Sequence, residues 1–349
     1  VVGFDGEIRE MEGSDLDLIN DAEGITGFIT QVELYVRPKE AETVMAATFE
    51  SSRAISAALK DLVSRDLPFW SLSFTNPVMG QLKNQMPPRI VHGEPVEEEV
   101  PKVPETYVLT GVVPKSRAEK IVPTFQDVVK ASGGTMLSEE EAEHEWEGRF
   151  KIMMVKRLGP SLIPAESIIP LEGLDTFLEE VEAKVKHLVV KEAVVLKSSG
   201  RGPELAILGF IPHDERSFGF APAFALSLSM LKIAKKVGGR AYATGLYFKH
   251  EGKSILGPER QEKIEAFKQK TDPKNLLNPD KVVGSPGMLG RMLQAASRAE
   301  PLGGIGGHRF RNSPEETFLK SGKLAPEVER HAYACAQCGY CVDGCDEFY

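Results

Sequence analysis

The stretch Tyr107-Val108-Leu109-Thr110-Gly111-Val112-Val113 is rich in apolar and β-branched residues and predicts a β-strand. Ser116 follows it as a predicted helix cap, and helical spacing continues until Gly133-Gly134. A second apolar run, over residues 205–211, predicts a buried strand at the other end of the same region. Strands and helices that alternate in this way over residues 106–212 predict an α+β fold.

The same patterns predict several more helices in the second half of the chain. Their ranges are residues 139–150, 174–185, 222–236 and 257–269. The most apolar stretch, residues 218–234, contains Gly219, Pro222 and Lys232. We therefore predict a buried helix there rather than a membrane span.

The residues before this region predict two different structures. Residues 28–36 largely alternate apolar with polar side chains, which predicts a half-buried strand that ends at Pro38. Residues 40–66 carry apolar side chains at helical spacing, which predicts one or two amphipathic helices. A run rich in proline and glutamate, residues 94–101, predicts a connector.

The composition is that of a globular protein and disfavours a nucleic-acid partner. The chain has 349 residues, of which 42% are hydrophobic and 27% charged, and its net charge is −9. No signal peptide pattern is visible, and cysteine is confined to one motif, so we expect a cytoplasmic protein that reaches a membrane only through partners. The chain opens on Val1 rather than Met, which suggests that an N-terminal portion is missing.

Four cysteines, the only ones in the chain, lie close together as Cys335, Cys338, Cys341 and Cys345. This C-x2-C-x2-C-x3-C spacing is typical of [4Fe–4S] proteins, in which three thiolates of a run bind one cluster and the fourth binds another. Zinc and disulfide bonds stay open as alternatives, although zinc sites usually separate their two cysteine pairs further. Since each cluster needs four ligands, the spacing predicts a second iron–sulfur segment, either beyond Tyr349 or on another redox subunit.

A short glycine-containing turn, Gly24-Ile25-Thr26-Gly27, precedes the strand predicted over residues 28–36. Glycines in such a turn let the backbone approach a ligand and present N–H groups to a phosphate. A plain turn is the simpler alternative, because glycine is the default turn residue.

Two segments resemble the FAD-linked oxidases of the vanillyl-alcohol-oxidase type, which include glycolate oxidase and D-lactate and D-2-hydroxyglutarate dehydrogenases. Residues 22–30, AEGITGFIT, resemble the family's G-S-E-G-T-L-G-I-I-T segment, and residues 271–281, TDPKNLLNPDK, resemble its closing F-D-P-x-x-(I/L)-L-N-P-G-K signature. In the family both segments lie against FAD. The resemblance therefore implies FAD as cofactor, with contacts from Glu23, Gly24, Thr26, Gly27, Ile29 and Asn278.

The resemblance also implies an order of domains. Residues 1–38 would be the C-terminal part of the FAD-binding domain, whose first half, with its pyrophosphate loop, is not in this chain. Residues 39–105 would be a helical segment and connector, and residues 106–284 a ferredoxin-like α+β cap domain that covers the substrate and returns to the flavin. Residues 285–349 would be a tether that ends in the iron–sulfur segment.

This sequence departs from the family at the place where many hydroxy-acid members bind a divalent metal. Their H-x-G-D-G-N-x-H and E-H-G motifs are both absent here. Other groups must then bind a carboxylate and remove a hydroxyl proton. Arg201 and His213 are candidates because they bracket the strand predicted over residues 205–211. Tyr247 and Lys249 are candidates because they follow the position of the lost glutamate motif, although a surface role is the simpler alternative for all four.

These motifs together predict a FAD-dependent dehydrogenase subunit that oxidises a small organic acid, with a 2-hydroxy acid as the expected class. Electrons would leave FAD through a [4Fe–4S] cluster for a partner, because an oxidase that reduces oxygen needs no cluster. The alternative is a non-catalytic electron-transfer or scaffold subunit of a larger redox complex, which the missing metal motifs favour.

Overall fold

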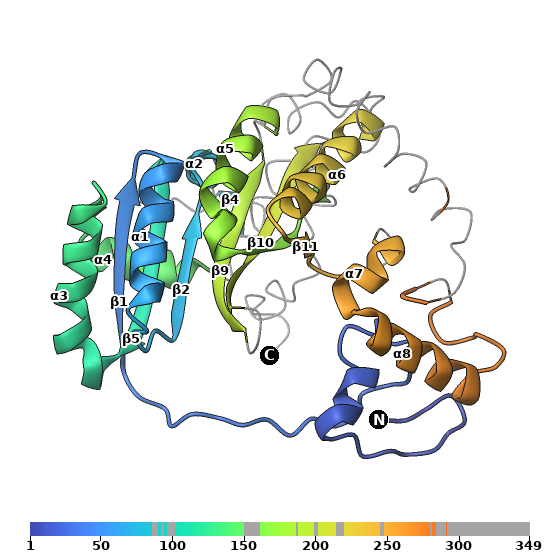
Figure 1. Ribbon diagram of the computed structural model, residues 1–349. Helices are drawn as coiled ribbons and strands as arrows, with labels where there is room; N and C mark the ends of the chain where they lie inside the picture. Colours follow the sequence, from blue (N-terminus) through green and yellow to red (C-terminus); the bar gives the residue numbers. More distant parts are fainter. Residues whose placement is uncertain are drawn as a thin grey trace.

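A computed structural model shows a large lobe built on a sheet and a small lobe that contains the N-terminus and helix α8 (Figure 1). The structure describes residues 1–85, 90–91, 94–95, 102–149, 161–185, 188–198, 202–213, 220–244, 248–279, 281–283 and 291. The described helices include none with the length and apolar character that crossing a lipid bilayer requires.

The sheet is antiparallel at every described pairing and holds nine strands within the described ranges. Its order is β11-β8-β10-β9-β2-β5-β1-β6, and β7 also pairs with β10. The strands are β1 (Glu42–Phe49), β2 (Ser71–Thr75), β5 (Tyr107–Pro114), β6 (Thr135–Met136), β7 (Ser161–Pro164), β8 (Ser167–Pro170), β9 (Val189–Ser198), β10 (Gly202–His213) and β11 (Arg240–Ala241). The predicted α+β class is confirmed, and a separate small hairpin pairs β3 (Ile90–Val91) with β4 (Glu94–Pro95).

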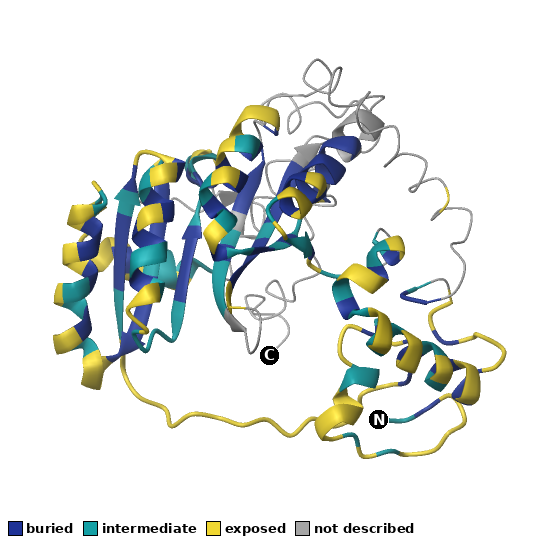
Figure 2. Cartoon of the chain, in the orientation of Figure 1, coloured by how far each residue is buried: buried dark blue, intermediate teal, exposed yellow. Residues whose placement is uncertain are grey.

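Four helices cover one face of this sheet, in front of it in Figure 1, and Figure 2 shows exposed residues on the sides that they turn toward the viewer. They are α1 (Ser52–Ser64), α3 (Lys115–Ala131), α5 (Leu174–Lys184) and α6 (Phe220–Lys236). Each contributes fully or largely buried side chains to one core with the strands, for example Leu59, Phe125, Phe177 and Ile233. The opposite face is covered near β1 and β5 by α4 (Glu139–Glu147), whose Ala142 packs against Ala46 and Val108.

Strand β1 corrects the helix predicted at the start of residues 40–66. Met45 and Ala47 face the core under the four helices, while Ala46 between them faces α4. Because both faces of β1 are covered, its central residues 44–47 are a continuous apolar run without the alternation that marks a half-buried strand. The helical part of the prediction is confirmed only from Ser52 onward, where the Ser51 hydroxyl caps α1.

The prediction of a strand over residues 28–36 is wrong. Within the described part of the chain, only Phe28 of this segment makes a β-bridge, to Val2, and the side chains that follow are exposed (Figure 2). Leu34 is 73% exposed and Val36 87% exposed. Alternation shows that one face could be buried, but a strand forms only where a neighbour accepts its hydrogen bonds.

The exposed segment, residues 29–36, is fixed to the large lobe just beyond its C-terminal end. The Arg37 guanidinium stacks over the Trp70 ring, 3.7 Å from the ring centroid, and the Ala41 carbonyl accepts from Lys115 N over 2.8 Å. The Glu40 carboxylate accepts from Ser116 N, so Ser116 is not the predicted cap of α3, which begins at Lys115.

The small lobe is assembled from residues that are far apart in the chain. It contains the helices η1 (Gly13–Leu18), α7 (Gly252–Leu256) and α8 (Pro258–Thr271), and η4 (Lys249–Glu251) leads into it from the large lobe. Ala22 and Ile25 pack against Leu256, Ile264 and Val282 in a small core of its own.

The remaining short elements are α2 (Pro77–Asn84) and η3 (Leu171–Gly173), both in the large lobe. The helices predicted over residues 139–150, 174–185, 222–236 and 257–269 are confirmed as α4, α5, α6 and α8, with α4 three residues shorter than predicted.

Candidate functional site

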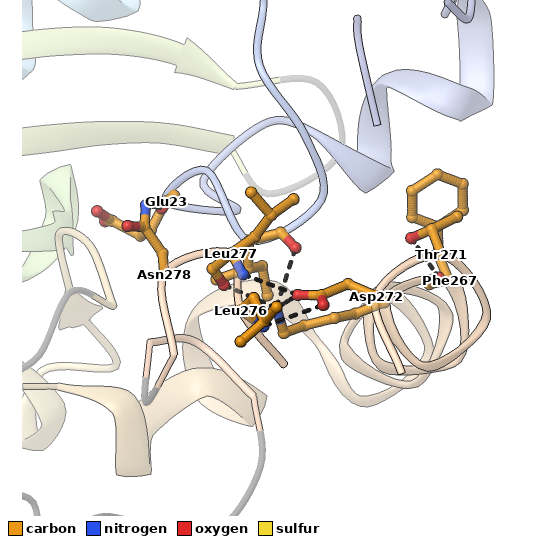
Figure 3. A network of polar contacts seen from close by, with 9 residues as sticks. Glu23, Phe267, Thr271, Asp272, Leu276, Leu277 and Asn278 are labelled. Carbon is orange, nitrogen blue, oxygen red and sulfur yellow. Dashed lines mark hydrogen bonds and ion pairs between the residues drawn. The ribbon is translucent and has the colours of Figure 1, made fainter. Parts of the chain in front are cut away.

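Two turns from distant parts of the chain meet on the small lobe. The first is residues 22–27, and the second is residues 272–278, directly after α8. The Asn278 side-chain Nδ2 donates to the Glu23 carbonyl over 2.6 Å, and Figure 3 shows the two residues side by side. We call these two turns the Gly24–Asn278 junction. Sequence reasoning placed both turns at one cofactor, and the structure brings Glu23, Gly24 and Asn278 together.

The backbone of this junction adopts unusual conformations. Glu23 has φ of 52° and Asn278 has φ of 37°, both in the left-handed region. Of the six non-glycine residues with positive φ in the described chain, five lie in the small lobe: Asp21, Glu23, Asn275, Asn278 and Val282. Such conformations cost energy for residues with a side chain and cluster at functional sites.

The two glycines of the first turn are required by contacts within the chain itself. A Cβ on Gly24, where φ is +72°, would lie 2.8 Å from Asn278 Nδ2. A Cβ on Gly27 would lie 2.8 Å from the carbonyl oxygen of Val2, whose backbone bridges to Phe28. The sequence analysis attributed both glycines to the approach of a ligand, whereas the structure gives each a structural reason.

The junction nevertheless presents groups that suit a cofactor. Among the described residues, the backbone N–H groups of Gly24, Thr26 and Gly27 donate to no carbonyl. Gly24, Ile29 and Asn278 are exposed, whereas Thr26 and Gly27 are buried, so of these three donors only the Gly24 N–H belongs to an exposed residue. Unused backbone donors beside an exposed carboxamide are suited to phosphate oxygens or to the polar edge of a flavin ring. The residues present therefore fit FAD, with the N–H groups of this turn and the Asn278 amide as the groups that would hold it.

A buried carboxylate at the end of α8 shapes the second turn. Asp272 accepts from Leu276 N over 3.0 Å and from Leu277 N over 2.8 Å, and it pairs with Lys268 (Figure 3). Burial raises the pKa of Asp272, but these hydrogen bonds and the Lys268 ammonium outweigh it, so its pKa lies below the usual range.

Sequence reasoning missed this pair, although two local signals could have found it. Lys268 and Asp272 are four residues apart, the spacing at which helical side chains meet. An aspartate before proline, as in Asp272-Pro273, commonly accepts hydrogen bonds from the backbone that follows.

Helix α8 also holds the chain before the first turn. The Arg260 Nε donates to the Asp17 carbonyl over 3.0 Å, and Arg260 Nη2 donates to the Asn20 carbonyl. Arg260, the buried Ile264 and Lys268 are four residues apart and so lie on one face of α8. This face of α8 therefore contacts the N-terminal segment from Arg260 to Lys268.

Strand β10 separates two of the predicted catalytic residues. It runs from Gly202 to His213, so its ends are roughly 36 Å apart at about 3.3 Å per residue. Arg201 immediately precedes this strand in the sequence and itself lies outside the described residues. A small acid cannot touch both ends of such a strand, and His213 lies at one of them.

Strands β10 and β11 run in the same direction through the sheet. Ala241 of β11 pairs with Ser167 of β8, which pairs with Ile207 of β10, and the chain leaves β11 in the direction of His213. That chain leads to η4, which begins with the buried Lys249. β11 therefore runs toward the end of β10 at which His213 lies, and residues 245–247, between β11 and η4, lie outside the described residues.

The remaining predicted site residues cannot be placed. Tyr247 and the four cysteines Cys335, Cys338, Cys341 and Cys345 lie outside the described residues, so their roles stay predictions. Across the described ranges, no group of three or more His, Cys, Asp or Glu side chains is arranged to bind a metal ion.

Comparison with known proteins identifies the family. The model of the FAD-linked oxidases, C-terminal domain, matches residues 38–282, and the chain therefore belongs to the FAD-linked oxidase family. The match includes Asn278 but begins after the first turn of the junction. No curated protein matches the sequence.

Two solved structures, both of alkyldihydroxyacetonephosphate synthase, are similar to this chain. Each is 15% identical in sequence, and each comparison covers 68% of the present chain, with TM-scores of 0.41 and 0.38. The matched regions make up 45% and 44% of those solved chains. This chain therefore spans less than half the length of the solved chains that it matches.

Proposed function

We propose that this chain is part of a FAD-dependent dehydrogenase subunit that oxidises a small organic acid, with a 2-hydroxy acid as the substrate class. The Gly24–Asn278 junction carries this proposal. In a member of the FAD-linked oxidase family, the two segments that resemble the family's FAD-lining motifs lie against each other, and within the described part of the chain the first of them contains backbone N–H groups that donate to no carbonyl.

The chemistry that the chain's own residues would provide is binding, orientation and proton removal. Oxidation of a 2-hydroxy acid to a 2-oxo acid removes two electrons and two protons, and FAD supplies the two-electron acceptor when it is bound. In this proposal Lys249 would bind the substrate carboxylate and His213 would accept the hydroxyl proton; the chain leaves β11 toward the His213 end of β10 before it reaches Lys249, which supports the pairing. Tyr247 remains a further candidate on the same stretch, and Arg201 would serve only if the substrate lay at the opposite end of β10.

The four cysteines would carry the electrons onward. Cys335, Cys338 and Cys341 have the spacing of three ligands to one [4Fe–4S] cluster, and Cys345 has the position of a ligand to a second one. A partner segment or subunit with its own cysteines would complete both clusters and accept the electrons.

An anaerobic titration of the purified full-length protein tests this function. We expect one enantiomer of a 2-hydroxy acid from a panel of D and L acids to bleach the flavin absorbance, and a cluster signal to appear by electron paramagnetic resonance. His213→Ala should slow the bleaching by about 100-fold or more, the range expected for a general base.

Cys338→Ser serves as the matched control, because it should remove the cluster signal and leave the bleaching intact. If no acid bleaches the flavin of a protein that retains FAD, the dehydrogenase proposal is wrong. The scaffold alternative would then account for the missing metal motifs.

A further inference from the structure

Lys268 is a buried lysine whose ammonium group has three partners. Its Nζ donates to the Leu277 carbonyl over 2.8 Å and to the Ile25 carbonyl over 3.3 Å, and it pairs with Asp272 Oδ2 at 2.9 Å. An ammonium group has three hydrogens, so these contacts satisfy it completely. Lys268 is only 6% exposed, so its ammonium group depends on these partners within the chain.

The two carbonyls that Lys268 holds belong to the two turns of the junction. Ile25 follows Gly24 directly, and Leu277 precedes Asn278 directly. Lys268 therefore links the two chain segments one or two residues away from the Asn278–Glu23 hydrogen bond. Without the ammonium group, the Ile25 and Leu277 carbonyls would each lose this donor, and the buried Asp272 carboxylate would lose its counter-ion and keep only its backbone donors.

From these contacts we propose that Lys268 is a positioning residue for the cofactor site. It fixes the first turn against the second, and so holds the exposed Gly24 beside the exposed Asn278, where the two could contact one ligand. The inference rests on the proposed function in one respect, namely that this ligand is FAD. Lys268 itself is buried beneath the junction and acts through the two turns.

The experiment compares variants of the full-length protein by hydrogen–deuterium exchange and by FAD affinity. Lys268→Met removes the ammonium group, and the double variant Lys268→Met/Asp272→Asn removes both charges so that neither is left buried alone. Lys270→Met, which alters an exposed lysine of the same helix, is the matched control.

We expect exchange in residues 20–28 and 274–279 to be about tenfold faster or more in both Lys268 variants, with β1 and β5 unchanged. The FAD dissociation constant should rise by about tenfold or more, and Lys270→Met should behave like the wild type. In an Asn278→Ala background the Lys268 change should have much less effect on FAD affinity, because both residues act through one contact.

Unchanged exchange in these two segments would overturn the inference. Faster exchange with an unchanged FAD dissociation constant would also overturn it, because Lys268 would then hold the lobe together without governing the cofactor. A wild-type protein that bound no FAD at all would instead contradict the proposed function, and the inference that depends on it.

Discussion

At the residue scale, Gly24 decides whether the two turns can meet. Its φ of +72° favours glycine, and the space that a Cβ would need is taken by Asn278 Nδ2. Gly6 offers a contrast in the same lobe, because its φ is +79° and nothing lies within 4 Å of the position that a Cβ would take. The two glycines share a backbone conformation and differ in their surroundings.

Substituting alanine at these two positions separates backbone strain from the contact with Asn278. Gly6→Ala should cost about 1–2 kcal/mol, the expected penalty of a left-handed L-residue. Gly24→Ala should cost at least about 1 kcal/mol more, because it also displaces the Asn278 side chain. Hydrogen exchange in the small lobe measures both losses, and equal losses would show that the Asn278 contact adds nothing.

At the scale of elements, α8 holds the small lobe together by contacts along one of its faces and at its C-terminal end. Arg260 and Lys268 bind carbonyls of the N-terminal segment, and Ile264 between them is buried in the lobe's core. At the end of the helix, Asp272 accepts the N–H groups of the turn that follows. A helix that would be marginal alone is thus fixed by tertiary contacts.

The lowered pKa of Asp272 makes the stability of the small lobe depend on pH. A carboxylate whose pKa is lower in the folded state contributes stability above its unfolded pKa of about 3.9, and that stability is lost as the pH falls through the folded value. We therefore expect exchange in residues 272–278, relative to β5, to accelerate below about pH 4.

Asp272→Asn should flatten this acid dependence, because the group that titrates is gone. Asp15→Asn, at an exposed acid of the same lobe, is the control and should leave the wild-type profile. An acid profile that survives in Asp272→Asn would assign the effect to another group.

At the scale of the whole molecule, the exposed segment over residues 29–36 joins two lobes that have separate cores. Tyr35 in this segment is fully exposed. Residues before the segment are held by the small core and by α8 rather than by the segment itself. The segment should therefore be cut without loss of the N-terminal residues.

Limited digestion of the 349-residue chain with chymotrypsin tests this expectation. We expect early cleavage at Tyr35, after which residues 1–35 should co-elute with the remainder in size-exclusion chromatography. Tyr35→Ser should remove this cleavage, and Ile264→Asp, which places a charge in the small core, should release the fragment. Release of residues 1–35 from the nicked wild type would contradict the packing of the small lobe.

Local signals in the sequence determined a large share of the secondary structure. The strand at Tyr107 and helices α5, α6 and α8 follow from residue type, periodicity and flanking glycine or proline. Helix α4 begins where Ser138 and Glu141 form a capping box, a contact that spans only three residues. The family was also predicted from two short motifs, because each motif is a single unbroken run of residues that can be recognised without knowledge of the fold.

Tertiary structure alone decided the features that depend on distant partners. β1 is a strand because β5 and β6 pair with it while α1, α3 and α4 cover its faces. Residues 29–36 are not a strand, because no described neighbour pairs with them. Lys268 reads in sequence as one of many charged helix residues, yet the fold buries it between carbonyls that are 243 and 9 residues away. Periodicity reports which side of an element can be buried, whereas the partner that buries it or accepts its hydrogen bonds is set by the packing of the whole chain.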